Sequence, residues 1–198
     1  MSCQDDVWES RLRQAAHCVA LRSPQYYGIR LGRLIGAERR YGLEVEFIHL
    51  KVISDTSKSF VATGQVQGLP VQGTVRMDTI AERYAMTHGL NFVLINGAFR
   101  RAIGDGAVAF TARAGAGPTY PHAESSIGGV RLEQYEYAGM GVHAAAGFDV
   151  RLRRQLSTIV EYKFTAARPV ITIAGDGTGR MLAVTHQLGA GLAFGLSR

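Results

Sequence analysis

Hydrophobic and polar residues alternate along the C-terminal part of the chain. Residues 155–165 and 182–196 each carry one row of apolar side chains and one row of small or polar side chains. The apolar rows are formed by Leu156, Val160, Tyr162, Phe164, Val184, Leu188, Ala190, Leu192, Phe194 and Leu196. This alternation predicts β-strands with two different faces, because successive side chains of a strand point to opposite sides. Each strand within these segments runs for about ten residues, the length that a tilted strand needs to cross a bilayer.

Further segments alternate in the same way, so that seven strands are recognisable. The additional segments are residues 24–35, 41–49, 88–96, 108–115 and 135–148. In residues 88–96 the apolar row of Leu90, Phe92 and Leu94 is blurred by Val93 and Ile95 on the other face. Charged residues sit opposite the apolar rows: Arg30, Glu44, Glu46, Arg113, Glu161 and Lys163. We expect these residues to pair in the interior of a barrel, with the apolar rows facing lipid.

The connections between the strands alternate in length. They are short at residues 36–40, 98–106 and 149–154, and long at residues 54–85, 118–134 and 167–182. Outer-membrane barrels have this form, with short turns on the periplasmic side and long loops outside. The sequence therefore predicts an all-β fold, an up-and-down antiparallel transmembrane β-barrel of the eight-stranded type.

Bacterial single-chain barrels close with an even number of strands, so one strand is missing or atypical. It would lie before Pro24, where residues 1–23 alternate poorly and are expected to form an atypical leader, a weak helix or a disordered segment. Residues 24–198 are expected to form the barrel domain. A soluble, lipocalin-like carrier is the structural alternative, because alternation alone does not tell which face is inside.

The net charge of +6 indicates an anionic partner. Nucleic acid and membrane phosphates both satisfy this sign, and the barrel pattern favours lipid over nucleic acid. Arg and Lys bind phosphate through charge-assisted hydrogen bonds. The candidate lipid-binding residues are Lys51, Arg131, Lys163, Arg180 and His186.

The histidines gather where the strands meet the long connections. By strand parity, His49, His88 and His186 belong to the lipid-facing rows, and His122 with Glu124 lies in a long connection. A neutral imidazole acts as a general base at physiological pH, and a carboxylate orients it. Candidate catalytic residues are therefore His49, His88, His122 and Glu124, although His is also an ordinary interface residue. No His-x-Glu-x-His spacing is present, so the sequence assigns no metal site.

Several stretches carry a family resemblance. They are residues 24–31 (Pro-Gln-Tyr-Tyr-Gly-Ile-Arg-Leu), 46–51 (Glu-Phe-Ile-His-Leu-Lys), 87–91 (Thr-His-Gly-Leu-Asn), 112–124 (Ala-Arg-Ala-Gly-Ala-Gly-Pro-Thr-Tyr-Pro-His-Ala-Glu), 160–163 (Val-Glu-Tyr-Lys) and 185–186 (Thr-His). The chain resembles the small outer-membrane barrels of the opacity-protein and outer-membrane-protein-A-like group. More narrowly, it resembles the outer-membrane lipid A oxidase family.

The resemblance implies a protein of the bacterial outer membrane that binds lipid A or lipopolysaccharide and is a monomer. It also implies oxidation of the proximal glucosamine of lipid A to aminogluconate at the extracellular rim, with molecular oxygen as co-substrate. The resemblance supplies no catalytic motif, so the catalytic candidates rest on their position at the rim. The alternative hypothesis is a non-catalytic structural or adhesin-type barrel.

Overall fold

The computed structural model describes residues 26–66, 69–175 and 177–195 of the chain. These residues form antiparallel β-strands and one short 3-10 turn, Met77–Thr79. No helix in this described part is long and apolar enough to cross a membrane. The predicted all-β fold class is confirmed.

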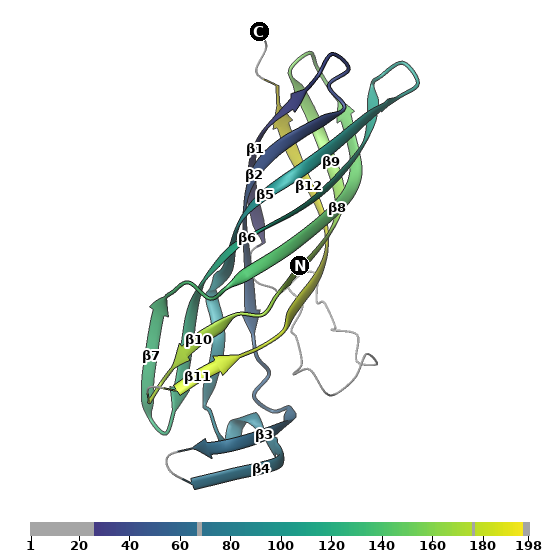
Figure 1. The fold of residues 1–198 in the computed structure, drawn as a ribbon. Helices are drawn as coiled ribbons and strands as arrows, with labels where there is room; N and C mark the ends of the chain where they lie inside the picture. Colours follow the sequence, from purple (N-terminus) through teal and green to yellow (C-terminus); the bar gives the residue numbers. More distant parts are fainter. Residues whose placement is uncertain (1–25, 67–68, 176, 196–198) are drawn as a thin grey trace.

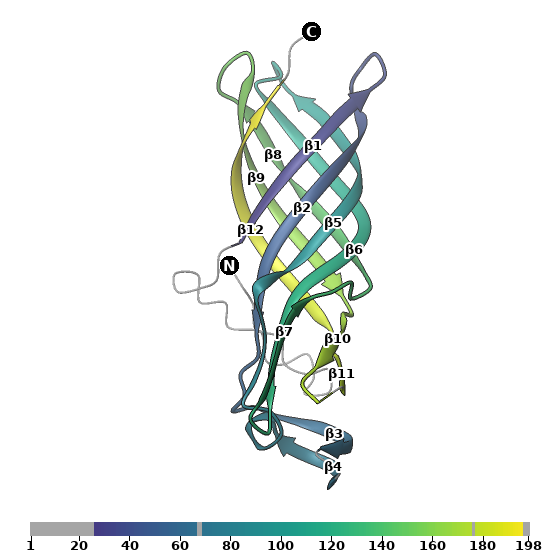
Figure 2. The same cartoon turned by 90° about the vertical axis from the view of Figure 1, so that its left-hand side faces the viewer.

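One sheet forms the body of the molecule and curls into a barrel (Figures 1 and 2). Its main strands pair antiparallel with their neighbours in chain order: β1 (Tyr27–Ile35), β2 (Tyr41–Ile53), β5 (Arg83–Ile103), β6 (Val108–Ile127), β8 (Met140–Arg151), β9 (Leu156–Ala167) and β12 (Ala183–Phe194). The seven predicted strands are present in up-and-down order. The leader and the eighth strand expected before residue 24 lie outside the described residues.

All the long connections gather at one end of the barrel, at the bottom of Figure 1, and the short turns at the other. The alternation of connection lengths is therefore confirmed. However, the long connections are not plain loops, since they contain strands: β3 (Ser59–Val66), β4 (Leu69–Arg76), β7 (Val130–Tyr135), β10 (Val170–Ile173) and β11 (Gly177–Arg180). β3 pairs with β4, β10 with β11, and β7 extends the main sheet beside β6.

The expected loop at residues 118–134 is wrong, because β6 continues through two prolines to Ile127. Proline lacks the backbone N–H that a sheet ladder uses, which argues against a central strand. In β6 the neighbouring groups compensate: the backbone N–H of Thr119 donates to Gly139, and Pro121 accepts a hydrogen bond from the backbone of Glu136. The strand therefore survives and forms a hairpin with β7.

The charged residues predicted to point inward form one ion-pair network inside the barrel. The Arg30 guanidinium lies 2.6 Å from a Glu161 oxygen and 3.1 Å from a Glu46 oxygen. The Lys163 ammonium lies 2.6 Å from Glu46 and 3.1 Å from Glu161, and Arg113 contacts Glu44 at 2.7 Å. This network joins β1 and β2 to β9 across the interior. The proposed lipid-binding role of Lys163 is not supported by this position, because its ammonium is buried between carboxylates.

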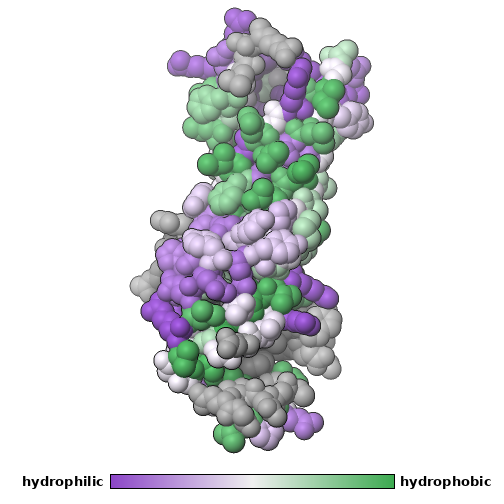
Figure 3. All heavy atoms as spheres, turned by 60° about the vertical axis from the view of Figure 1, so that its left-hand side comes forward, coloured by the Kyte–Doolittle hydropathy of each residue, from purple (hydrophilic) through white to green (hydrophobic). Residues whose placement is uncertain are grey.

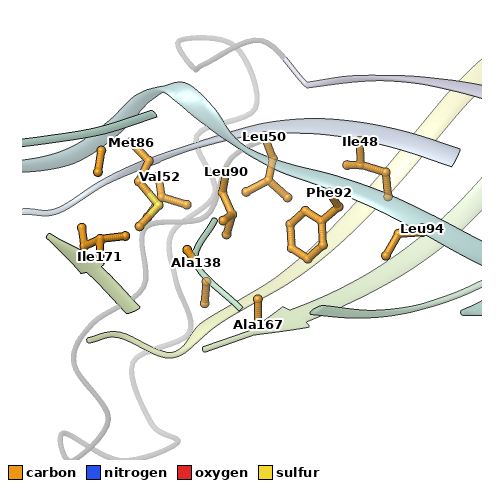
Figure 4. Close-up of a cluster of buried hydrophobic side chains, with 12 residues drawn as sticks. Ile48, Leu50, Val52, Met86, Leu90, Phe92, Leu94, Ala138, Ala167 and Ile171 are labelled. Atoms are coloured by element: carbon orange, nitrogen blue, oxygen red, sulfur yellow. The ribbon is translucent and has the colours of Figure 1, made fainter. Parts of the chain in front are cut away.

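The interior nearer the long connections is apolar instead. Leu90, Phe92 and Leu94 of β5 are buried there together with Ile48 of β2 and Ile171 of β10 (Figure 4). The row of Leu90 therefore faces inward, and Val93 with Ile95 faces out. This corrects the parity assignment, which placed the rows of His88 and Leu90 on the same outer face.

Large apolar side chains cover the outside of the barrel. Figure 3 shows hydrophobic residues gathered over the upper, barrel part of the molecule. Exposed members on the barrel strands are Ile29, Leu31, Leu43, Val45, Ile95, Met140, Val142, Val160, Leu188 and Leu192. Where the ion-pair network fills the interior, the barrel therefore has charged side chains inside and apolar side chains outside.

Candidate functional site on the outer face of β5, β6 and β7

A bulge in β5 places His88 on the outer face of the sheet. Leu50 of β2 pairs with Leu90 and Val52 pairs with Met86, so residues 87–89 of β5 lie opposite Lys51 alone. Extra residues in one strand break its regular alternation and redirect side chains. His88 therefore points outward, although it is two residues from the inward-facing Leu90.

Gly89 makes this bulge possible. Its φ of +97° lies in a region that side-chain-bearing residues rarely adopt. A Cβ atom at this position would also lie 2.5 Å from the imidazole ring of His49.

We expect Gly89→Ala to lower the free energy of unfolding by about 1–3 kcal/mol, because alanine adds backbone strain and a contact with His49. Chemical denaturation followed by circular dichroism measures this loss. Gly189→Ala is the matched control, since its φ is ordinary and nothing lies within 4 Å of the added carbon; there we expect a change below about 0.5 kcal/mol. Equal losses in the two variants would contradict this account of the bulge.

The bulge brings His88 to two residues on the outer row of β6, forming a compact group. His88, His122, Glu124 and Glu133 each offer one ligand-type atom, and these atoms lie within 4.8 Å of one another. We call these four residues the outer-face cluster. The Nδ1 atoms of His88 and His122 are 3.1 Å apart, and Glu124 Oε1 lies 3.6 Å from the first and 4.0 Å from the second.

Glu133 enters the cluster from β7. It lies directly opposite Glu124 in the β6–β7 ladder, and its Oε1 is 3.6 Å from Nε2 of His122. The ring of Tyr135 lies 4.3 Å from that of His122, centroid to centroid. The β6–β7 hairpin is held to the start of β5 by Glu82, whose pKa is lowered by a hydrogen bond from the Ser126 hydroxyl.

Two arginines balance the carboxylates of the cluster. Arg83 Nε donates to Glu124 Oε2 at 2.8 Å, and Arg131 donates to Glu133 Oε2 at the same distance. Glu124 is only 3% exposed, whereas more than half of each arginine side chain remains exposed. The arginines therefore keep part of their donor capacity for an anionic ligand from the surrounding medium.

The structure thus brings together three of the four catalytic candidates, His88, His122 and Glu124, with the lipid-binding candidate Arg131. His49 lies on β2, on the far side of β5 from β6. Its Nδ1 is 2.8 Å from Asn91 Oδ1, and its ring stacks on Tyr27 at 4.6 Å. His49 therefore has a structural environment of its own.

The remaining candidates are placed as follows. Lys51 lies on β2 opposite the β5 bulge, which contains His88 of the cluster. His186 lies on β12 against Tyr162 and Phe164 of β9, which are separated from β6 by β8. Arg180 lies on β11, in the hairpin that contacts the inner face of the sheet through Ser125. His186 and Arg180 are therefore not part of the cluster.

The sequence reasoning missed Arg83 and Glu133. Both lie in segments that were expected to be loops, and strand parity could not be applied to them. The alternation of Arg131, Glu133 and Tyr135 with Leu132 was the available signal for β7.

The cluster places the exposed imidazole of His88 next to the buried carboxylate of Glu124. One imidazole accepts a proton while Glu124 or Glu133 orients the ring, the arrangement of a general base. The same nitrogen and oxygen atoms are ligands for a metal ion. The chain matches no protein-family model and no curated protein.

Proposed function

We propose that this chain is an outer-membrane barrel that binds lipid A or lipopolysaccharide beside the outer-face cluster. The proposal rests on the distribution of side chains in the barrel: a buried ion-pair network lies inside, and large apolar side chains are exposed outside. Contiguous apolar surface of this kind marks contact with a membrane or a partner. A soluble carrier of an apolar ligand would need the opposite arrangement at the barrel centre.

Aromatic residues at both ends of the apolar band support a membrane location. Tyr41, Phe99, Phe110, Phe148 and Phe194 lie near the short turns. Tyr27, Tyr120, Tyr135 and Tyr137 lie towards the long connections. Membrane barrels carry such aromatic girdles at the two interfaces. The nine residues of β1 between the two levels fit a tilted transmembrane strand.

The level of the cluster supports recognition of a lipid head group. His122 follows Tyr120 on the outer row of β6, beyond the apolar band and on the side of the long connections. An outward side chain at this height meets the head groups of the outer leaflet. Arg83 and Arg131, with more than half of each side chain exposed, suit the phosphates of lipid A, and the net charge of +6 has the matching sign.

Oxidation of the bound lipid is the activity that we propose for the cluster, in keeping with the resemblance to lipid A oxidases. Converting the anomeric carbon of the glucosamine from a hemiacetal to a lactone removes two electrons and two protons. Molecular oxygen takes up the two electrons and the two protons and becomes hydrogen peroxide. Water then opens the lactone to aminogluconate. His88 or His122 accepts the hydroxyl proton and passes it to the reduced oxygen, and the carboxylates of Glu124 and Glu133 stabilise the imidazolium while it holds the proton.

A non-catalytic adhesin or structural barrel is the second candidate. The β3–β4 hairpin favours it, because this hairpin projects beyond the barrel end (Figure 2) and exposes Val61 and Leu69. Exposed apolar side chains on a projecting hairpin suit contact with a partner protein. In that case the outer-face cluster binds lipid but catalyses no reaction on it.

Mass spectrometry of lipid A separates the two candidates. The full chain is directed to an outer membrane whose lipid A carries a free anomeric hydroxyl group on the proximal glucosamine and is not oxidised there, and we expect this lipid A to gain one oxygen atom on its glucosamine backbone. His88→Ala and Glu124→Gln should abolish this gain, while Glu38→Gln, at the short-turn end, should retain it. Unchanged lipid A, together with a protein shown to be folded in the membrane, would favour the non-catalytic barrel.

A further inference from the structure

We infer that the outer-face cluster binds a divalent transition-metal ion, with His88 Nδ1, His122 Nδ1 and Glu124 Oε1 as its three protein ligands. The site lies on the outer surface of β5 and β6. It rests on the positions of these atoms and does not depend on lipid binding or oxidation. The general-base role proposed above belongs to the cluster without an ion.

The three atoms form a triangle of the size that a metal ion requires. Its sides are 3.1, 3.6 and 4.0 Å. The point equidistant from these atoms is about 2.1 Å from each, which matches the usual zinc distances of about 2.0–2.2 Å to imidazole nitrogen and carboxylate oxygen. The atoms therefore need little rearrangement to hold an ion.

Glu124 and His122 each present their second polar atom to another residue. Glu124 Oε2 accepts a hydrogen bond from Arg83 Nε at 2.8 Å, which leaves Oε1 for the ion. Nε2 of His122 faces Glu133 Oε1 at 3.6 Å, while Nδ1 of the same ring faces the proposed ion position. Partners of this kind orient metal-binding imidazoles and make them more basic.

The donor set selects the class of ion. Two imidazoles and one carboxylate suit zinc, iron and cobalt, whereas calcium and magnesium prefer oxygen ligands alone. His88 is 61% exposed on the outward side. With His88, His122 and Glu124 as the ligands, and with Glu133 facing Nε2 of His122, the ion keeps an open position for water or an external ligand, as catalytic metal sites do.

The charges around the proposed ion position are balanced. Without an ion, the carboxylates of Glu124 and Glu133 balance the guanidinium groups of Arg83 and Arg131. A divalent ion adds positive charge, and an anionic ligand in the open coordination position would offset part of it. The two arginines weaken the attraction for the ion, because they hold positive charge next to its ligands.

Cobalt titration of the purified full chain tests the inference. The protein is untagged, treated with a chelator and carries Cys3→Ser and Cys18→Ser, because thiolates also bind cobalt. We expect visible absorption bands of imidazole-bound Co²⁺ that saturate at one ion per chain, and Zn²⁺ should displace them. Separate His88→Gln, His122→Ala and Glu124→Gln changes should each weaken binding at least tenfold.

His186→Ala is the matched control, because it removes an outer-face histidine of the same barrel away from the cluster. We expect it to keep full cobalt affinity. Circular dichroism verifies the fold of every variant, and His88→Gln guards against loss of fold because its side chain is exposed. Absence of cobalt binding, binding retained when both His88 and His122 are replaced, or an equal loss in His186→Ala would overturn the inference. If the protein binds cobalt but the mass spectrometry described above shows no oxidation of lipid A, the metal site is supported and only the oxidase proposal fails.

Discussion

Replacing Glu46 with alanine is expected to lower the free energy of unfolding by about 3–5 kcal/mol. Glu46 is 1% exposed and contacts Lys163 at 2.6 Å, Arg30 at 3.1 Å and the amide nitrogen of Asn96 at 2.7 Å. Its removal leaves Arg30 and Lys163 to share Glu161, so the interior network carries one positive charge in excess. Excess charge in the interior is costly because it is only partly compensated by the remaining carboxylates. Urea unfolding of the folded barrel, followed by circular dichroism, measures the loss.

Glu38→Ala is the matched control for this prediction. Glu38 also pairs with an arginine, Arg40, at 2.6 Å, but both side chains are exposed at the short turn. Exposed pairs contribute little, so we expect a change below about 1 kcal/mol. A similar, small effect in both variants would mean that the interior network is hydrated and does not hold the barrel together.

Replacing Leu31 with lysine is expected to destabilise the barrel in a lipid bilayer by about 2–4 kcal/mol. Leu31 is 74% exposed at the centre of β1, where the proposed membrane band has its middle. A lysine there must leave its charge in hydrocarbon or bend towards the interface. The measurement is unfolding of the variant and the parent protein in vesicles of the same lipid.

Leu69→Lys supplies the comparison, because Leu69 is 69% exposed on the β3–β4 hairpin beyond the barrel. In water this substitution should change stability by no more than about 0.5 kcal/mol. The two leucines have nearly the same exposure, so the difference between them reports the surrounding medium. If both substitutions are tolerated equally in vesicles, the outer surface of β1 does not face lipid and the membrane proposal fails.

The sequence by itself determined the β-barrel architecture. Alternation with a period of two identifies a strand and its two faces without knowledge of the fold. It correctly placed Glu46, Glu161 and Lys163 together on the inside, because charges that alternate with apolar residues must find partners when the sheet curls. The spacing of the strands also predicted which connections are short and which are long.

The tertiary structure decided which of the predicted candidates form the site, and it added Arg83 and Glu133 to them. His88 lies outside, although its parity matches the buried Leu90, because the bulge opposite Lys51 changes the local direction of β5. Glu133 joins the cluster because β7 pairs with β6 in one particular register. Bulges and strand registers depend on hydrogen bonds between segments far apart in the chain, and a single-residue pattern does not contain them. The same reason separates His49 and His186 from the cluster, although the sequence placed all of these histidines on one outer row.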